Sequence, residues 1–274
     1  HHDLVHHQHV LEDEAFEKRL PSLAWHGEDA DVTVMFFHPL FEHMSRHVKV
    51  GLCGQGADEL HAGYPRYGGL KDHARVLNRR IDALPERLRT SLRSGELSGE
   101  DGWYASAHEP SRVASNLQTM LNFELEHGQL SNFQLRLVDR HSMAHSLEVR
   151  VPFLGKAHRS AAYALPNEWK RSDGREEKAA LRKAAELTKL PSEIVRRTKL
   201  PAGRATSPSM LERFLGERRS QIEELMDHFR PWAAVLEGQE ELALGLGLFE
   251  ALHLNDDGHT KASKSIDSLL AEVI

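Results

Sequence analysis

The stretch Val48–Tyr64 constrains the fold of this chain more than any other segment. Its first residues, VKVGL, alternate apolar side chains with lysine and glycine, which predicts a short buried strand. Gly54 and Gly56 then allow a sharp turn, and Ala57–Leu60 begins a predicted helix. A strand, a glycine turn and a helix start are typical of an open α/β sheet, in which ligands bind at the carboxyl edge. An ordinary strand-to-helix turn with a capping aspartate is the alternative.

Two acidic residues, Asp58 and Glu59, fall in the first turn of this predicted helix. Carboxylates at this position interact favourably with the helix dipole. They could also hold a metal cation, because oxygen ligands suit hard divalent ions. The turn is therefore a candidate site for a ligand and a metal.

Composition narrows the class of protein. The chain has 274 residues, of which 40% are hydrophobic and 28% charged, which predicts one large soluble domain. A net charge of −6 argues against a general nucleic-acid binder. The single cysteine, Cys53, excludes an internal disulfide and fits a reducing compartment. No apolar run approaches the ~20 residues that span a bilayer, and the amino end lacks a secretory pattern. We expect a cytoplasmic protein with no membrane or nucleic-acid partner.

The amino-terminal segment is rich in histidine, with five histidines in its first nine positions. A metal site is one interpretation, but the spacing matches no standard ligand set. A solvated segment or the remnant of a tag is the interpretation that we favour.

Most of the remaining chain has helical patterns. Helices are predicted over Leu11–Trp25, Met35–His47, Leu70–Arg93 with an interruption at Pro85, Arg112–His127, Lys156–Leu165, Gly174–Leu187, Met210–Phe229 and Glu240–Leu254. Residues 92–102 are predicted to be a mobile connection, 201–208 a loop, and the tail after Asn255 frayed. Only one strand is clear, so part of a parallel sheet is expected to come from residues that the chain lacks or hides.

Three stretches together resemble the synthetase domain of the glutamine-dependent asparagine synthetases. Val48–Tyr67 is similar to a strand followed by the family's S-G-E-G-A-D-E-L-F-G-G-Y-P-R-Y. Val138–Leu154 is similar to V-D-R-x-S-M-A-H-S-L-E-V-R-V-P-F-L-D, and Gly174–Lys199 to G-x-x-K-x-x-L-R-x-A followed by L-P-x-x-I-x-x-R-x-K. Order and spacing agree over about three quarters of the chain, which is more specific than any single motif.

The resemblance implies a fold and a reaction. The fold is a parallel-sheet α/β domain of the ATP-pyrophosphatase (adenine nucleotide α-hydrolase-like) type over residues 1–274, helix-rich, with a helical extension from about residue 205. The cofactors are ATP and Mg²⁺. The side-chain carboxylate of aspartate, or of an analogue, attacks the α-phosphate of ATP and forms an acyl-adenylate. Ammonia from a separate glutaminase domain then attacks the acyl carbon and releases AMP.

The same resemblance implies roles for individual residues. Adenylation builds charge on phosphoryl oxygens, which requires Mg²⁺ and well-placed cations. By position in the motif, Asp58 holds Mg²⁺–pyrophosphate and Lys178 neutralises phosphate charge; with Gln55 they are the catalytic candidates. The cofactor-binding candidates are Cys53, Gly54, Gln55, Gly56, Lys178 and Lys199.

Further residues have weaker assignments. Asp139, Arg140 and Glu148 organise either the site or the core, since an Asp–Arg pair in a helix is more often a solvated ion pair. Arg197 and Lys199 either reach phosphate or stabilise a helix end. A surface lysine paired with acidic neighbours is the alternative for Lys178.

Two parts of the family pattern do not occur in these 274 residues. The Ser-Gly-Gly-x-Asp-Ser loop that grips pyrophosphate is absent, and Gly68-Gly69 follows no strand. The glutaminase domain, with its amino-terminal cysteine, is absent as well. Three interpretations stay open: a fragment of a longer protein, residues missing from the sequence, or a true loss of pyrophosphate binding.

Several substitutions surround the expected acceptor pocket. Gln55 replaces a glutamate, and its neutral amide cannot act as a base near pH 7. Cys53 replaces a serine and is expected to be a small buried residue and not a nucleophile. His61-Ala62 replaces Phe-Gly, Gly155 replaces an aspartate, and LPAGRATSP follows Lys199 in place of a Q-G-F-like segment. The substrate could therefore differ from aspartate.

Three functions remain in competition. The first is an ATP-dependent amidotransferase of the asparagine-synthetase type. The second is a ligase that forms an intramolecular amide, as β-lactam synthetases do. The third is a non-catalytic nucleotide-binding or interaction module. Association as a homodimer is left open by the sequence.

Overall fold

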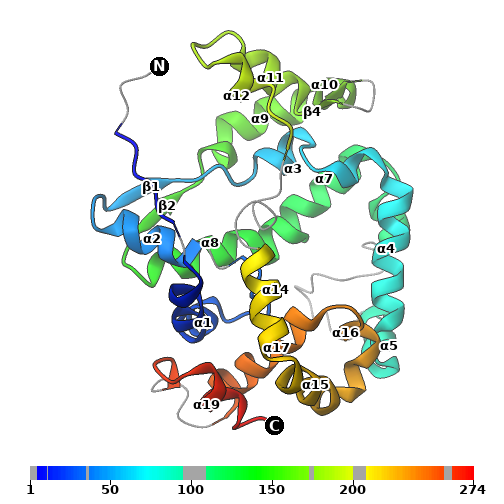
Figure 1. Cartoon of the computed structure of the whole chain (residues 1–274). Coiled ribbons are helices and arrows are strands. Elements are labelled where there is room, and N and C mark those ends of the chain that lie inside the picture. Colours follow the sequence, from blue (N-terminus) through cyan, green and yellow to red (C-terminus); the bar gives the residue numbers. More distant parts are fainter. Residues whose placement is uncertain are drawn as a thin grey trace. The chain divides into compact units, whose positions relative to one another are not determined.

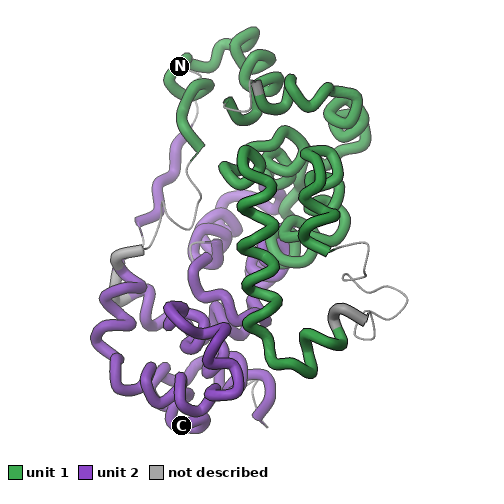
Figure 2. Tube along the Cα trace, turned by 90° about the vertical axis from the view of Figure 1, so that its right-hand side faces the viewer, with its two compact units in different colours: residues 1–4, 52–136, 149–199 green, residues 5–51, 137–148, 200–274 purple. Residues whose placement is uncertain are grey.

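The computed structural model describes residues 5–10, 12–34, 37–94, 109–172, 176–199, 208–255 and 261–274. These residues form a helix-rich α/β structure with a small parallel sheet. By packing, the chain divides into two compact units, coloured separately in Figure 2. Unit 1 contains residues 52–136 and 149–199, and unit 2 contains residues 5–51, 137–148 and 200–274. The predicted mobile connection lies largely outside the described residues, as does most of the predicted loop over 201–208.

Unit 1 is mostly helical. Its helices are α3 (Ala57–His61), α4 (Leu70–Ala83), α5 (Glu86–Ser94), α6 (Pro110–Val113), α7 (Leu117–Glu126), α9 (Lys156–Ala164), α10 (Asn167–Lys170), α11 (Ala179–Ala185) and α12 (Ser192–Val195). Its tighter or wider helical turns are η1 (Pro65–Gly68), η3 (Leu130–Gln134) and η4 (Pro152–Leu154). The helix α3 packs against α7, α9 and α11, as Figure 1 shows, so residues distant in sequence surround it.

Unit 2 contains the larger apolar core. Its helices are α1 (Asp13–Gly27), α2 (Phe37–Ser45), most of α8 (Leu135–Met143), α14 (Pro208–Glu217), α15 (Arg219–His228), α16 (Ala233–Leu236), α17 (Glu240–Phe249) and α19 (Ile266–Leu270). The first two residues of α8 belong to unit 1. The helical turns of unit 2 are η5 (Arg230–Trp232) and η6 (Glu250–Leu254). Fully buried residues of α17, such as Leu244 and Leu248, pack with Leu20 of α1 and Leu269 of α19. The prediction that Glu240–Leu254 closes a core is confirmed.

The parallel sheet consists of β1 (Val50–Leu52) and β2 (Glu148–Arg150). The N–H of Glu148 donates to the Lys49 carbonyl, and the N–H of Cys53 donates to the Arg150 carbonyl, so both strands run in one direction. The predicted strand is confirmed, but its predicted burial is wrong, since Leu52 is 71% exposed. A parallel strand becomes buried when neighbours cover both of its faces, and β1 pairs with one strand only within the described residues.

Other predictions are confirmed in outline and corrected in detail. The predicted helix Gly174–Leu187 begins later, because Glu176–Glu177 forms β4, which pairs antiparallel with β3 (Arg171–Ser172). The tail is not frayed throughout, since α19 buries Ile266, Leu269 and Leu270. Helices are present from Pro208 onward, while their status as a separate extension stays a prediction. Among the described helices, none has the length and apolar character needed to cross a bilayer.

Candidate functional site

Three side chains from distant parts of unit 1 converge on one point. The Nζ of Lys178 lies 2.9 Å from Oδ1 of Asp58, and the Nζ of Lys199 lies 3.3 Å from Oδ2. Asp58 belongs to α3, Lys178 directly precedes α11, and Lys199 follows α12. Asp58 is 12% exposed at its side chain, and the two lysines are 19% and 24% exposed. The structure thus brings together three of the residues singled out from the sequence.

Lys178 is held in an unusual backbone conformation. It has φ 56° and ψ 32°, which is the left-handed region that residues with a side chain rarely adopt. Its N–H donates to the carbonyl of His61 in α3, at 3.1 Å. This geometry ends β4 and begins α11, and it directs the lysine side chain at Asp58. Non-glycine residues in this region cost of order 1 kcal/mol and cluster at functional sites.

Gly63 leaves the space in which the ion pair forms. A Cβ atom built on Gly63 would lie 2.1 Å from Oδ1 of Asp58 and 2.2 Å from Cε of Lys178. No side chain larger than hydrogen fits without displacing one of the two partners. The sequence argument missed this role, although the glycine stands inside the quoted motif, two residues after α3.

A partly buried arginine, Arg182, fixes the position of Lys199. Arg182 donates to the carbonyls of Val195 at 2.6 Å and Arg197 at 3.0 Å, and it pairs with the Glu177 carboxylate at 2.6 Å. The same carboxylate accepts the backbone N–H of Lys199 at 3.2 Å. The pKa of Glu177 is lowered, since hydrogen bonds from the backbone and from Arg182 outweigh the opposing effect of burial. Arg182 therefore joins α11 to the segment that carries Lys199, a role that the sequence argument also missed.

Glu59 is a buried carboxyl group next to Asp58. It is 0% exposed, and neither carboxylate oxygen has a hydrogen-bond partner among the described residues. Burial raises its pKa to about 7, and the like charges of Asp58 and Glu124 add to the rise. Glu124 itself pairs with Arg66 at 2.8 Å, so that arginine is engaged elsewhere. Glu59 can gain or lose a proton near neutral pH.

The electrostatic character of the site is cationic. Two ammonium groups face a single carboxylate, which leaves one positive charge in a part-buried position. The ring of Tyr64 lies 5.4 Å from the Nζ of Lys199 and adds a cation–π contact. Such a site suits a polyanion, because phosphate oxygens could compete with Asp58 for both lysines.

The turn between β1 and α3 contains the remaining predicted nucleotide contacts. Cys53 is a free, partly exposed cysteine whose N–H bonds to β2, so its predicted burial is only partial. Gln55 is partly exposed, and Gly54 is exposed with open space around it. Gly56 has φ 89°, and a Cβ there would lie 2.3 Å from Leu154. The turn therefore requires glycine at Gly56.

The supporting candidates take other positions. Arg140, in unit 2, pairs with Glu28 at 2.8 Å and donates to the Gly27 carbonyl, so it stabilises the end of α1. Asp139 and Glu148 are exposed. Arg197 is exposed in unit 1 and contributes its carbonyl to Arg182. None of these contacts involves Asp58 or the two lysines.

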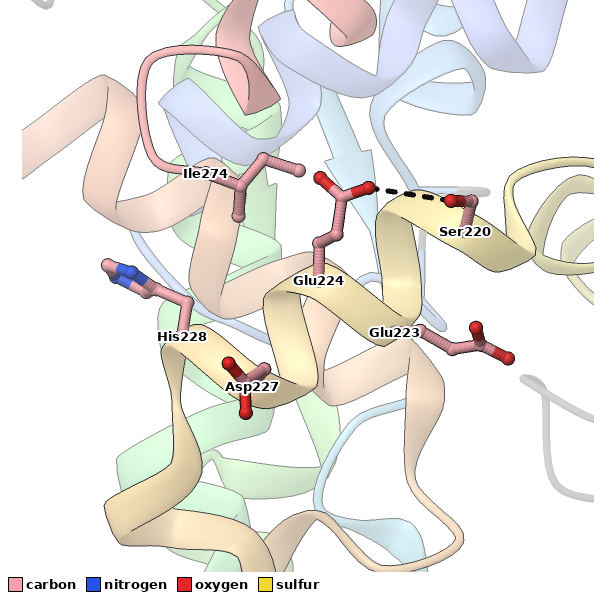
Figure 3. A pocket seen from close by; sticks show the side chains of 6 residues that line it. All are labelled: Ser220, Glu223, Glu224, Asp227, His228 and Ile274. Carbon is pink, nitrogen blue, oxygen red and sulfur yellow. Dashed lines mark hydrogen bonds between the residues drawn. The ribbon is translucent and has the colours of Figure 1, made fainter.

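A separate hollow of about 480 Å³ lies along α15 in unit 2. Its lining residues are Ser220, Glu223, Glu224, Asp227, His228 and Ile274. Figure 3 shows the hydrogen bond that the Ser220 hydroxyl donates to the Glu224 carboxylate. The side chains of Glu223 and Asp227 point away from that of Glu224. The hollow contains none of the predicted site residues, and its acidic side chains do not converge.

Comparisons with known proteins agree with the motifs. A model of the asparagine synthase family matches residues 1–241. Asparagine synthetase (glutamine-hydrolyzing) 1 of Bacillus subtilis is 28% identical over an alignment of 233 residues, and the match covers 70% of this chain and 36% of that protein. Asparagine synthetase (glutamine-hydrolyzing) 3 of the same organism is 31% identical over an alignment of 216 residues, and the match covers 75% of this chain and 33% of that protein. A putative asparagine synthetase (glutamine-hydrolyzing) of Mycobacterium bovis is 27% identical over an alignment of 232 residues, and the match covers 70% of this chain and 35% of that protein. The chain spans about a third of the length of these relatives.

Proposed function

The chain belongs to the asparagine synthase family, and we propose that it forms the adenylating part of an ATP-dependent amidotransferase. It activates the side-chain carboxylate of an amino acid, aspartate or an analogue, for amide formation with ammonia. The observation that carries the proposal is the convergence of Lys178 and Lys199 on Asp58. The finer fold assignment, an ATP-pyrophosphatase-type domain, is part of the same proposal.

The proposed roles follow from charge. Attack of a carboxylate on the α-phosphate of ATP places negative charge on phosphoryl oxygens, and ammonium groups that face them lower the barrier. Lys178 is the main contributor, since its backbone is fixed by the bond to His61. Lys199 binds the polyphosphate beside it. Before ATP arrives, Asp58 holds both ammonium groups in place, so the cations are oriented in advance. The turn from Cys53 to Gly56 contributes backbone contacts to the nucleotide.

The residues fit Mg²⁺ in company with a polyphosphate. Each Asp58 oxygen has a further lone pair beyond its lysine contact. Two ammonium groups would repel a bare dication, whereas Mg²⁺ ordinarily takes one or two carboxylates together with substrate phosphates. Asp58 is the residue that would hold the ion, and Mg²⁺ would neutralise developing phosphate charge.

The partners are proposed on the names of the relatives, which describe glutamine-hydrolysing enzymes. We propose that ammonia comes from a glutaminase domain and that the protein acts in the cytoplasm. Neither a second subunit nor a nucleic acid is needed for this chemistry.

The test is release of pyrophosphate by the complete gene product from ATP and Mg²⁺, with ammonium and a panel of carboxylates that includes aspartate. We expect release that depends on one carboxylate. Lys178→Ala should lower it by at least about 100-fold. Lys183→Ala is the matched control, because this lysine lies on α11 with its side chain 77% exposed.

Two results would contradict the proposal. One is the absence of carboxylate-dependent release with every member of the panel. The other is an unchanged rate in Lys178→Ala. ATP binding without turnover, unaltered by Gln55→Glu, would instead support a non-catalytic nucleotide-binding module.

A further inference from the structure

Three histidines of unit 2 lie together: His7 of the amino-terminal stretch, and His43 and His47 at the end of α2, about forty residues further along the chain. Their imidazole nitrogens, one each from His7, His43 and His47, all lie within 4.8 Å of one another. The ring centroids of His7 and His47 are 4.5 Å apart, those of His43 and His47 are 5.1 Å apart, and those of His7 and His43 are 5.8 Å apart. The cluster joins the amino-terminal stretch to the end of α2, and Figure 1 shows that stretch passing α2.

From this geometry we propose that His7, His43 and His47 form a binding site for a transition-metal ion of the Zn²⁺ class. Imidazole is a ligand that suits Zn²⁺, Ni²⁺ and Cu²⁺. Three histidines supply three ligands of a tetrahedral Zn²⁺ site, and an exchangeable water takes the fourth position. Within the described residues, this is the one group of three or more metal-ligating side chains with such close atoms.

The local structure supplies two of the ligands in a fixed relation. His43 lies in the last turn of α2, and His47 follows four residues later. The Val48 N–H donates to the Met44 carbonyl at 3.0 Å, and the His47 N–H donates to the same carbonyl at 2.9 Å, which keeps the chain wound up to His47. The two rings therefore project to one side, as residues four apart on a helix do.

The state of His43 also favours a ligand. Its Nε2 atom is buried and has no hydrogen-bond partner among the described residues. A buried polar atom without a partner is costly, and a metal bond would satisfy it. His7 and His47 are exposed, so an ion can enter from solvent.

The histidine nitrogens must move slightly closer together to bind one ion. Two nitrogens that bind one tetrahedral zinc ion at about 2.1 Å lie about 3.4 Å apart. The observed limit of 4.8 Å is wider, and rotation of exposed imidazoles would close the difference. The amino-terminal stretch would then be tied to α2 by the metal.

The experiment titrates the metal-free full chain with Zn²⁺ by calorimetry, and with Co²⁺ by its visible absorption. We expect one tight site, with the Co²⁺ spectrum of a four-coordinate ion. His43→Ala and His47→Ala should each weaken binding by at least about 100-fold, because a lost ligand costs more than a lost supporting contact. His6→Ala is the matched control, and it should leave the affinity unchanged.

A second readout follows the stretch itself. Zn²⁺ should slow hydrogen exchange of backbone amides in residues 5–10 in the unaltered chain and in His6→Ala, but not in His47→Ala. If His43→Ala and His47→Ala keep the full affinity, the ion binds to the histidine-rich terminus alone and the proposal is wrong. Unchanged exchange in residues 5–10 with Zn²⁺ bound would also overturn it. Both outcomes are independent of the proposed amidotransferase activity.

Discussion

Replacing Glu59 with glutamine should change how the stability of the chain depends on pH. Glu59 is fully buried beside Asp58, and neither of its oxygens is hydrogen-bonded among the described residues. Burial raises its pKa from an ordinary value of 4.5 to about 7. The folded protein therefore binds a proton that the unfolded chain has already released between these two pH values.

The sign and size follow from this difference. Because Glu59 binds fewer protons in the unfolded state than in the folded state between pH 4.5 and 7, its contribution to stability falls as pH rises through that window. Each pKa unit is worth about 1.4 kcal/mol, so the full loss above pH 7 is about 3 kcal/mol. Between pH 5 and 8.5 the loss is about 2.5 kcal/mol. Glu59→Gln cannot ionise and should lack this loss.

The assay is urea unfolding at pH 5 and pH 8.5, followed by tryptophan fluorescence and circular dichroism. The relevant quantity is the difference between the two pH values within each protein, because any cost of burying the new amide is the same at both. Glu86→Gln, at an exposed position in the first turn of α5, is the control and should behave as the unaltered chain. If the change in unfolding free energy between pH 5 and pH 8.5 is the same in Glu59→Gln as in the unaltered chain, the buried carboxyl argument is refuted.

Three further predictions concern the same molecule. Gly63→Ala should displace Asp58 or Lys178 and lower the free energy of unfolding by about 1–3 kcal/mol in urea. The same change should abolish ATP-dependent pyrophosphate release, and normal release would show that the ion pair is dispensable. Arg182→Gln should cost about 2–4 kcal/mol in the same unfolding assay, since it removes the guanidinium that bonds to Glu177 and to the carbonyls of Val195 and Arg197. Burial lowers the pKa of His141 to about 4, so the contribution of His141 to stability should fall as pH drops from 6.5 toward 4. His141→Phe should remove about 3 kcal/mol of acid destabilisation, and an unchanged midpoint of acid unfolding would contradict this prediction.

The local signals in the sequence were sufficient for many of the elements. The glycine turn and the acids that follow it predict β1 and α3, and both are present. The position of Pro85 predicts the break between α4 and α5, which is also observed. Burial was harder to predict, because it depends on what covers a segment. Alternation along VKVGL predicts a buried strand, yet Leu52 is exposed where β1 has one partner strand in the described residues.

The contacts of the site depend on backbone geometry that composition does not reveal. Lys178 was expected inside a helix, because GREEKAALRKAA has a strong helical pattern. Its left-handed conformation instead places it between β4 and α11. Only the resemblance to a family pattern could have identified that position. The histidine cluster has the same limitation, since His7 lies far from His43 in sequence and no spacing rule joins them.

A single arrangement explains why Lys178 tolerates its strained backbone. Its N–H bonds to the last residue of α3, while its Nζ bonds to an aspartate one turn earlier in that helix, so α3 holds the lysine at both ends. Gly63 leaves the room that Cε of Lys178 occupies, since a Cβ on Gly63 would lie 2.2 Å from that atom. The strain is therefore maintained by α3 and Gly63 jointly. A site whose cation is fixed in this way before a ligand arrives needs little reorganisation when phosphate charge develops, which is the property that adenylation requires.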